Sequence, residues 1–325
     1  MKKFFKRLLQ VIGVLLFEII FIFGLGVYLI YYTNLFTTTR DMIVTTSMTT
    51  MTHQYFATFF LSDEKINEII ASTRLTAEAE DQDLSEVDTS KVSHDASGSL
   101  QGIEIQDVST DTFRAYLMII DDPSRVSLVT APSVGDVGST TSQIIEHYNA
   151  VGGINAGGLA DDAAGTGGIP TGLLIENGEY YNVNPYEYYS MCGFTQDNVL
   201  YVSDSVSKST LDTLNLRCGV SFGPVLIVNG TPRIGSGAGW GIQPRTCIGQ
   251  RQDGKVLFLV IDGRQKDSVG ATLKNAQDIL LNAGAYNAFN LDGGASSTMV
   301  FDSKVVNKPS DILGERYVPT AFIVK

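Results

Sequence analysis

The residues whose types and spacing best suit chemistry lie in one short stretch, residues 290–299. Apolar and aromatic residues predict a strand ending near Leu291, and the carboxylate of Asp292 follows it directly. Gly293 and Gly294 then allow a ligand to approach bare backbone, before the hydroxyls of Ser296, Ser297 and Thr298. This arrangement predicts a site for an oxyanion or a polyol. A tight turn, with Asp292 bonding its own backbone, is the simpler alternative.

Further polar side chains adjoin glycines or apolar stretches along the chain: Asn155, Arg245, Asp262, Arg264, Glu315 and Arg316. We expect them to meet along one edge of a sheet. Arginines with hydroxyls and glycine amides suit a phosphate, and two or three carboxylates suit acid–base work at a glycosidic carbon. The alternatives are an ion pair at a hairpin end, Asp262 with Arg264, and a solvated charge pair, Glu315 with Arg316.

Other chemistries have little support in the sequence. Of the three histidines, His53 and His94 fall in the N-terminal third and His147 on a predicted helix, which disfavours a Ser-His-Asp triad. The glycines form no nucleotide-binding fingerprint, and no G-x-S-x-G elbow occurs. The three cysteines lack zinc-ligand spacing, so one disulfide with a free thiol and three buried thiols are both open. We expect no metal and no cofactor.

Composition indicates a folded chain with an acidic body. Hydrophobic residues make up 44% of the 325 residues and charged residues 18%. The net charge is −12; four basic residues against Glu18 give the first 32 residues +3, which leaves −15 for the remainder. A body so acidic is a poor partner for nucleic acid, whose phosphates require clustered Lys and Arg.

The N-terminus reads as a membrane anchor. Residues 1–7 form a basic cytoplasmic leader, and the apolar residues 8–32 are long enough to span a bilayer. Glu18 costs roughly 2.5–3.5 kcal/mol near the centre, but some seventeen Leu, Ile, Val and Phe each return roughly 0.3–0.6 kcal/mol. The leader places the remainder outside the cell, in a single-pass topology. A cleaved signal peptide is the alternative.

The rest of the chain divides into a juxtamembrane segment with an acidic linker, residues 33–99, and a body, residues 100–325. Within the first, residues 63–74 predict a short helix with Ile66 and Ile69 on one face. The body predicts a hairpin over 113–130, a helix over 140–151, a buried strand over 255–261 and an amphipathic helix over 272–282. Its strands and hairpin turns favour an α+β fold, a mixed, largely antiparallel sheet flanked by a few helices.

Taken together, these motifs resemble the phosphodiester glycosidase family. The resemblance covers roughly residues 100–325 and rests, in order, on residues 153–158, 170–172 with 177–178, 222–230, 244–249, 262–264, 290–298, 307–310 and 315–316. Gly158-Leu159-Ala160 departs from the aromatics that often follow in the family. Ala295 stands where a third glycine is common.

The resemblance implies hydrolysis of a sugar-1-phosphodiester at its glycosidic C–O bond, in a cell-surface or exopolysaccharide glycan. The implied carboxylates are Asp262, Asp292 and Glu315. Arg245, Arg264 and Arg316 would hold phosphate, and the implied groups orienting the substrate are Asn155, Gly293, Gly294, Ser296, Ser297 and Thr298. Two alternatives remain: a tethered module that only binds polysaccharide, and a metal-dependent phosphodiesterase with Asp262 and Asp292 as ligands.

Overall fold

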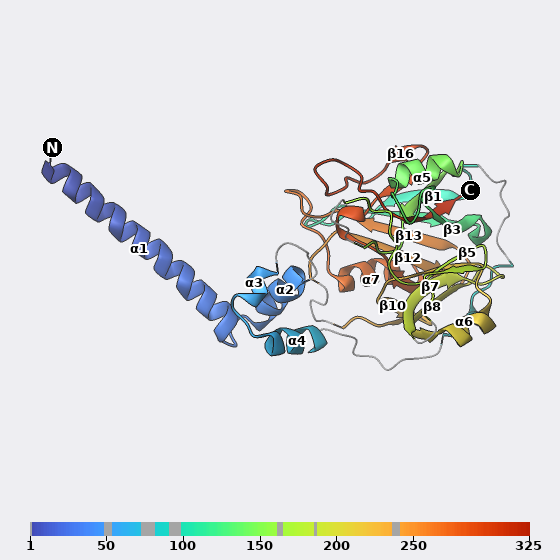
Figure 1. Cartoon of the computed structure of the whole chain (residues 1–325), viewed down its shortest axis with the longest axis horizontal. Coiled ribbons are helices and arrows are strands. Elements are labelled where there is room, and N and C mark those ends of the chain that lie inside the picture. Colours follow the sequence, from blue (N-terminus) through green and yellow to red (C-terminus); the bar gives the residue numbers. More distant parts are fainter. Residues whose placement is uncertain are drawn as a thin grey trace. The chain divides into compact units, whose positions relative to one another are not determined.

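The structure, a computed structural model, describes residues 2–48, 54–72, 82–90, 99–160, 165–184, 187–235 and 241–325. These form two compact units (Figure 1). The smaller comprises Met1–Arg74 with Gly237–Gly241, and the larger comprises Leu75–Ser236 with Ile242–Lys325. The predicted glycine-rich stretch at 235–241 lies almost wholly outside the described residues.

The smaller unit is helical. Its helices are α1 (Lys2–Tyr32), α2 (Thr37–Met48), α3 (Tyr55–Thr58) and α4 (Asp63–Ser72). Phe4–Tyr32 is long and apolar enough to cross a membrane. A small core joins Tyr31, Val44, Ala57, Ile66 and Ile69. The helix predicted over 63–74 is therefore confirmed, with its isoleucine face packed inward.

The larger unit is built on a seven-stranded sheet of order β1-β2-β13-β12-β14-β10-β11. Its strands are β1 (Ile103–Asp107), β2 (Ala115–Ile120), β10 (Val225–Val228), β11 (Thr231–Pro232), β12 (Arg245–Arg251), β13 (Val256–Ile261) and β14 (Ala285–Asn290). Every residue of β13 is buried, as its continuous apolar run predicts. Helix α7 (Leu273–Asn282) begins at the Thr272 cap and packs on β14 and its neighbours.

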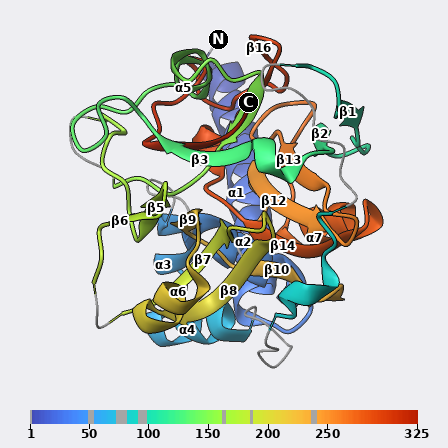
Figure 2. The same cartoon turned by 90° about the vertical axis from the view of Figure 1, so that its right-hand side faces the viewer.

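Two five-stranded sheets complete the larger unit (Figure 2). The second sheet has the order β16-β15-β4-β17-β3, from β3 (Val126–Thr130), β4 (Gly152–Asn155), β15 (Met299–Phe301), β16 (Lys304–Val305) and β17 (Thr320–Val324). The third has the order β6-β5-β9-β7-β8, from β5 (Leu174–Glu176), β6 (Glu179–Tyr181), β7 (Tyr188–Phe194), β8 (Leu200–Ser207) and β9 (Cys218–Ser221).

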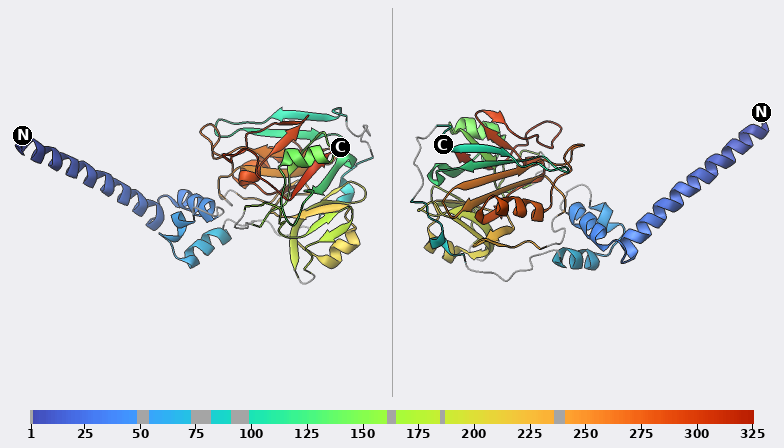
Figure 3. Two further views of the ribbon diagram at one scale, coloured as in Figure 1. Left: turned by 45° about the horizontal axis from the view of Figure 1, so that its top comes forward. Right: turned by 180° about the vertical axis from the view of Figure 1, so that it is seen from behind.

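Short helices accompany these two sheets. Helix α5 (Thr141–His147) packs on β17 and β4, and appears in green beside the red strands in Figure 3. Helix α6 (Lys208–Leu214) follows β8 directly. The single-turn helices are η1 (Leu84–Glu86), η2 (Pro123–Arg125) and η3 (Gly294–Ser296).

One core joins the three sheets. The ring of Phe322, from β17, lies 6.3 Å from that of Phe258 on β13 and 6.3 Å from that of Phe194 on β7. All three side chains are fully buried. The strand pairings in the described part of the chain are antiparallel throughout, so the predicted α+β class is confirmed, with three sheets in place of one.

Two local predictions need correction. The hairpin predicted over 113–130 is wrong, because β2 joins the first sheet and β3 the second, with η2 between them. The helix predicted over 140–151 is shorter, since Asn149 adopts φ +50° two residues beyond the end of α5. The cysteines are buried free thiols, which settles the choice left open above.

Part of the predicted acidic linker lies against the larger unit. The Gln82 carboxamide donates to Leu200 O (2.6 Å) and accepts from Val202 N (2.7 Å), and so occupies the open edge of β8 as a strand would. Asp88 N donates to Gln252 O (2.8 Å). Val87 between them is buried. We call residues 82–90 the strap.

We expect Val87→Ala to destabilise the larger unit by about 2 kcal/mol, because it removes two buried methyl groups. Thermal unfolding of the full-length chain in nanodiscs, monitored through the circular dichroism signal of the β-sheets, measures this loss of stability. Val183→Ala, at an exposed position, is the matched control. Equal melting temperatures for both variants would mean that the strap contributes nothing to the fold.

Candidate functional site

The site lies where strands of two sheets end side by side. Because β12 is antiparallel to both β13 and β14, the start of β12 at Arg245 shares an edge with Asp262 and Asp292, which follow those strands. The amide of Asp292 donates to Ala156 O (2.9 Å), directly after β4 of the second sheet. Three of the polar residues predicted to meet along a sheet edge, Arg245, Asp262 and Asp292, therefore lie at one edge, at the join between two sheets.

Asp292 has the electrostatics of an acid–base group. Burial raises the pKa of its carboxyl to about 6, even though a hydrogen bond with Ser296, the charges of Arg316 and Arg264 and the Gly293 amide all favour the ionised form. A pKa so close to neutrality lets one carboxyl group exist in both protonation states under physiological conditions. The alternative of a tight turn, in which Asp292 only bonds its own backbone, is thus incomplete. The carboxylate does bond the Gly293 amide, but the charges of Arg316 and Arg264 act on it as well.

The charges of two arginines act on this carboxylate. Arg264 is exposed and its backbone is left-handed (φ +58°), and its Nη2 donates to Gln243 Oε1 (2.5 Å). Burial lowers the pKa of Arg264, the charge of Arg316 lowers it further, and Asp292 opposes both effects. Two guanidinium groups thus repel one another beside a single carboxylate. A bound anion would relieve that repulsion.

Arg245 lies deeper in the protein. Its side chain is 4% exposed, and Nε donates to Ala271 O (3.1 Å). Burial lowers the pKa of Arg245 to about 10, and the positive charge of Arg264 contributes to the shift. Arg245 therefore adds positive charge next to Arg264, whereas Arg264 and Arg316 are the cations that act on the Asp292 carboxylate.

The two glycines after Asp292 meet different constraints. A Cβ on Gly293 would lie 2.6 Å from Pro244 O, so packing alone requires glycine there. Gly294 has φ +62°, donates to Pro244 O (2.9 Å), and a Cβ on it would approach Arg264 Nη2 to 3.3 Å. The bare backbone predicted for ligand approach therefore lies at Gly294, beside the Arg264 guanidinium.

The three hydroxyl residues are all buried, at 1–2% exposure. Ser296 contacts the Asp292 carboxylate. Ser297 Oγ and Thr298 Oγ1 have no hydrogen-bond partner among the described residues. Of the three hydroxyl residues, Ser296 is the one that contacts the Asp292 carboxylate.

Asp262 is engaged in holding the chain. Its carboxylate accepts from Asn307 Nδ2 (2.8 Å) and from Lys308 N (3.1 Å to each oxygen). Burial raises the pKa of Asp262, while these hydrogen bonds lower it. Asp262 is not among the groups that shift the pKa of Asp292. It fixes the segment that follows Asp292, and does not form an ion pair with Arg264.

Asn307 is a functional residue that sequence reasoning left without a role. Besides bonding Asp262, it donates to Ser297 O (3.0 Å) and accepts from Met299 N (2.7 Å). One side chain thereby ties the hydroxyl turn to the end of β13. Its signal in the sequence was only its place in the motif set, because a lone asparagine beyond a short strand is typical of ordinary turns.

Glu315 and Arg316 point to different partners. Glu315 Oε2 accepts from Ser142 N (3.0 Å), in the first turn of α5, where backbone amides lack helical partners. Glu315 does not appear among the groups acting on Asp292, whereas Arg316 does. The electrostatics of Asp292 therefore involve Arg264 and Arg316, whereas the Glu315 carboxylate lies at the start of α5.

Asn155 braces the site from the second sheet. It is fully buried, its Nδ2 donates to Asp292 O (2.6 Å), and its Oδ1 accepts from Thr246 Oγ1 (2.8 Å) and Thr298 N (3.1 Å). Both ends of its amide are therefore occupied by protein groups. Asn155 positions the backbone of Asp292 and does not face a ligand.

We expect Asn155→Ala to lower the free energy of unfolding by about 3 kcal/mol, because it leaves buried donors and an acceptor unpaired. Chemical denaturation measures this effect. Asn282→Ala, an exposed change at the end of α7, is the control. An unchanged stability in Asn155→Ala would show that water replaces the amide without loss.

No group of three or more His, Cys, Asp or Glu that could hold a metal ion occurs in the described part of the chain. The carboxylates of Asp262 and Asp292 face different partners, as given above. A shared metal between these two side chains therefore has no geometric support here.

Comparison with known proteins places the site in context. A sequence model described as phosphodiester glycosidase matches residues 148–325. The SPbeta prophage-derived uncharacterized protein YomE of Bacillus subtilis is 31% identical over 179 residues, 52% of this chain and 27% of that protein. Bovine N-acetylglucosamine-1-phosphodiester alpha-N-acetylglucosaminidase is 37% identical over 70 residues, 22% of this chain and 13% of the enzyme. The chain thus spans about a quarter or less of these relatives.

Two solved structures share the fold. The catalytic domain of zebrafish N-acetylglucosamine-1-phosphodiester alpha-N-acetylglucosaminidase, auto-inhibited by its pro-peptide, has a TM-score of 0.56 at 22% identity, over 70% of this chain and 86% of that one. A putative exported protein from Burkholderia pseudomallei has a TM-score of 0.51 at 17% identity, over 65% of this chain and 74% of that one.

Proposed function

Because the chain belongs to the phosphodiester glycosidase family, we propose that it hydrolyses the glycosidic bond of a sugar-1-phosphodiester and releases the sugar and a phosphomonoester. The observation that carries the proposal is the Arg264 guanidinium, which lies beside the Gly294 backbone in the turn that follows Asp292, while the charges of Arg264 and Arg316 both act on the Asp292 carboxylate. Two cations that repel one another favour an anionic ligand, and the carboxylate beside them has a pKa suited to proton transfer.

In the proposed complex the phosphodiester lies against Arg264, Arg316 and the Gly294 backbone. Guanidinium groups bind phosphate oxygens through paired, charge-assisted hydrogen bonds. Arg245 adds positive charge from behind. This arrangement stabilises the negative charge that develops on the phosphate as the bond to the sugar breaks.

In the proposed reaction, water forms the new bond to the sugar C1, the C1–O bond breaks, and its electron pair stays on the phosphate oxygen. Ionised Asp292 stabilises the positive charge on the sugar and accepts a proton from the water. Asp292 then passes this proton to the phosphomonoester or to solvent. A phosphate leaving group needs little protonation. One carboxylate therefore suffices, and Asp262 and Glu315 are left to their positioning roles.

We further propose that α1 anchors the chain in a membrane with the larger unit outside the cell, where a phosphorylated cell-surface or exopolysaccharide glycan is the substrate. The basic leader and the apolar length of α1 support this topology. Protease protection of the full-length chain in intact cells tests it, because only an outward-facing larger unit is digested.

The decisive experiment uses the full-length chain in nanodiscs with the methyl phosphodiester of N-acetylglucosamine-1-phosphate, in ¹⁸O-labelled water. Phosphorus NMR follows the phosphate, and mass spectrometry follows the sugar. Glycosidic cleavage gives methyl phosphate without label and labelled sugar. Label in the phosphate would mean that the P–O bond broke, which contradicts the proposal. Loss of activity in EDTA would indicate a metal-dependent phosphodiesterase.

A further inference from the structure

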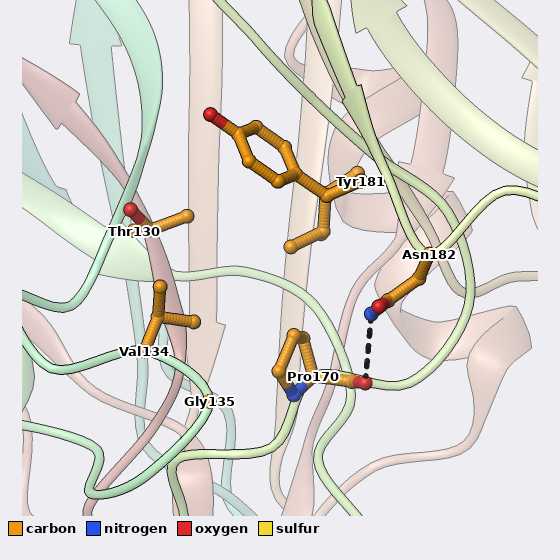
Figure 4. A pocket seen from close by; sticks show the side chains of 7 residues that line it. Thr130, Val134, Gly135, Pro170, Tyr181 and Asn182 are labelled. Atoms are coloured by element: carbon orange, nitrogen blue, oxygen red, sulfur yellow. Dashed lines mark hydrogen bonds between the residues drawn. The ribbon is translucent and has the colours of Figure 1, made fainter.

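A cavity of about 210 Å³ lies between the second and third sheets. Thr130 ends β3, Val134 belongs to the loop after it, and Leu174 begins β5; Pro170, Tyr181 and Asn182 complete the lining side chains. Figure 4 shows these side chains around the opening. At ~30 Å³ per molecule the cavity equals roughly seven waters. It is of a size for a single sugar ring, below the ~300–1,000 Å³ of typical ligand pockets.

Hydrogen bonds hold the walls in place before any ligand arrives. Thr130 donates through N (3.3 Å) and Oγ1 (3.0 Å) to the Glu176 carboxylate, and its carbonyl accepts from Tyr148 OH (3.1 Å). Asn182 Nδ2 donates to Pro170 O (3.2 Å), the dashed line in Figure 4. A wall already fixed by the protein loses little entropy on binding.

The lining has the chemistry of a neutral polyol site. None of the cavity's lining residues is charged, and the nearby Glu176 already accepts from Thr130. Tyr181 is 47% exposed and offers an aromatic face. Its hydroxyl and Asn182 Oδ1 have no hydrogen-bond partner among the described residues. An apolar face with free polar tips matches a sugar ring, whose C–H face and hydroxyls require both.

The cavity connects to Asp292 through the backbone. Pro170 lines the cavity, and the next residue, Thr171, donates its amide to Gly158 O (3.0 Å). Gly158 lies two residues beyond Ala156, whose carbonyl accepts the Asp292 amide. The glycine-rich turn after β4 thus runs from the backbone of Asp292 to the residue that follows Pro170 at the cavity rim, with the Phe222 ring against Gly158.

From this continuity we infer that the cavity is a second sugar subsite, which binds a neutral pyranose residue of the same glycan whose phosphodiester lies at Asp292. The inference rests on the proposed function for the link between the two sites, whereas sugar binding in the cavity stands on the lining alone. The enzyme then prefers a glycan chain to a single phosphorylated sugar.

The test uses the full-length chain in nanodiscs and two variants of the cavity. Tyr181→Ala removes the aromatic face, and Val134→Phe fills the space. Tyr188→Ala changes another exposed tyrosine, in β7 of the same sheet, and is the control. Saturation-transfer NMR with the methyl pyranosides of glucose, galactose, mannose and N-acetylglucosamine measures binding in the millimolar range.

We expect at least one pyranoside to bind, its signal to fall several-fold in Tyr181→Ala and Val134→Phe, and hydrolysis of the single-sugar methyl phosphodiester to stay unchanged. Binding that is absent for all four sugars, or equal in all variants, overturns the subsite. If wild-type protein binds sugar through Tyr181 but hydrolyses nothing, the subsite stands and the proposed function falls. If the wild-type protein hydrolyses the phosphodiester but binds none of the sugars through Tyr181, the subsite falls and the proposed function stands.

Discussion

Asp292→Asn should reduce turnover by a factor on the order of 10²–10⁴ and leave the protein folded. The amide keeps the size of the carboxyl group but neither accepts a proton nor stabilises a positive sugar carbon. Phosphomonoester release from the methyl phosphodiester measures the effect. Asp253→Asn, in the exposed β12–β13 turn, is the control. A variant that retains more than half of the wild-type rate would remove Asp292 from the chemistry.

The same substitution should raise stability at neutral pH. Burial holds the pKa of native Asp292 near 6, above the ordinary value of 3.8. Between these values the native state binds more protons than the unfolded state, so wild-type stability falls as pH rises through this window. The difference amounts to at most about 3 kcal/mol. Asp292→Asn lacks this loss, and its advantage should grow from pH 4 to pH 7. Denaturation at several pH values tests the sign.

The second large effect concerns the arginines. We expect Arg264→Gln and Arg316→Gln each to lower kcat/KM by a factor on the order of 10–10², because each removes charge-assisted hydrogen bonds worth roughly 1.5–3 kcal/mol. The double variant should lose about 10³ or more. Arg251→Gln, whose guanidinium pairs with Asp253 in an exposed hairpin, is the control.

The arginine variants should also move the pH profile. Activity requires ionised Asp292, so kcat/KM should rise as pH passes about 6 in the wild type. Arg316 and Arg264 each favour that ionised form, so loss of either charge raises the pKa of Asp292 and moves the rise to higher pH. A profile that shifts to lower pH, or stays in place, would contradict the assignment of these charges to Asp292.

Local patterns in the sequence were sufficient for many elements. The apolar run of β13, the amphipathic face of α7 and the Asn-Gly turn between β5 and β6 each depend on neighbours within a few residues. Within the predicted hairpin over 113–130, a turn does form at Asp122, whose carboxylate accepts from Ser124 N (2.9 Å). The predicted pairing of β2 with β3 was wrong nonetheless, because the sheet that a strand joins is decided by packing against residues far away in the sequence.

The residues of the site also divide into those that sequence patterns could place and those that they could not. Asp292 and Gly294 follow β14, and Arg264 follows β13. Both strands pair with β12, so the position of these residues after a strand is enough to bring them to one edge of the sheet. The directions of Asn155 and Glu315 could not be predicted, since both side chains point to amides or carbonyls over a hundred residues away. A polar side chain at a strand end is equally suited to a ligand or to the protein's own backbone, and periodicity does not distinguish the two.

The bond between Asn155 and Asp292 joins residues 137 positions apart, and it crosses from the second sheet to the first. Contacts of such long range form slowly, because the chain between them must be closed before they contribute. The geometry around Asp292 therefore has no local precursor, because Asp292 follows a strand of the first sheet and Asn155, which holds its backbone, lies in the second. During refolding, return of activity should follow return of strand signal, and the delay between them times the docking of the two sheets.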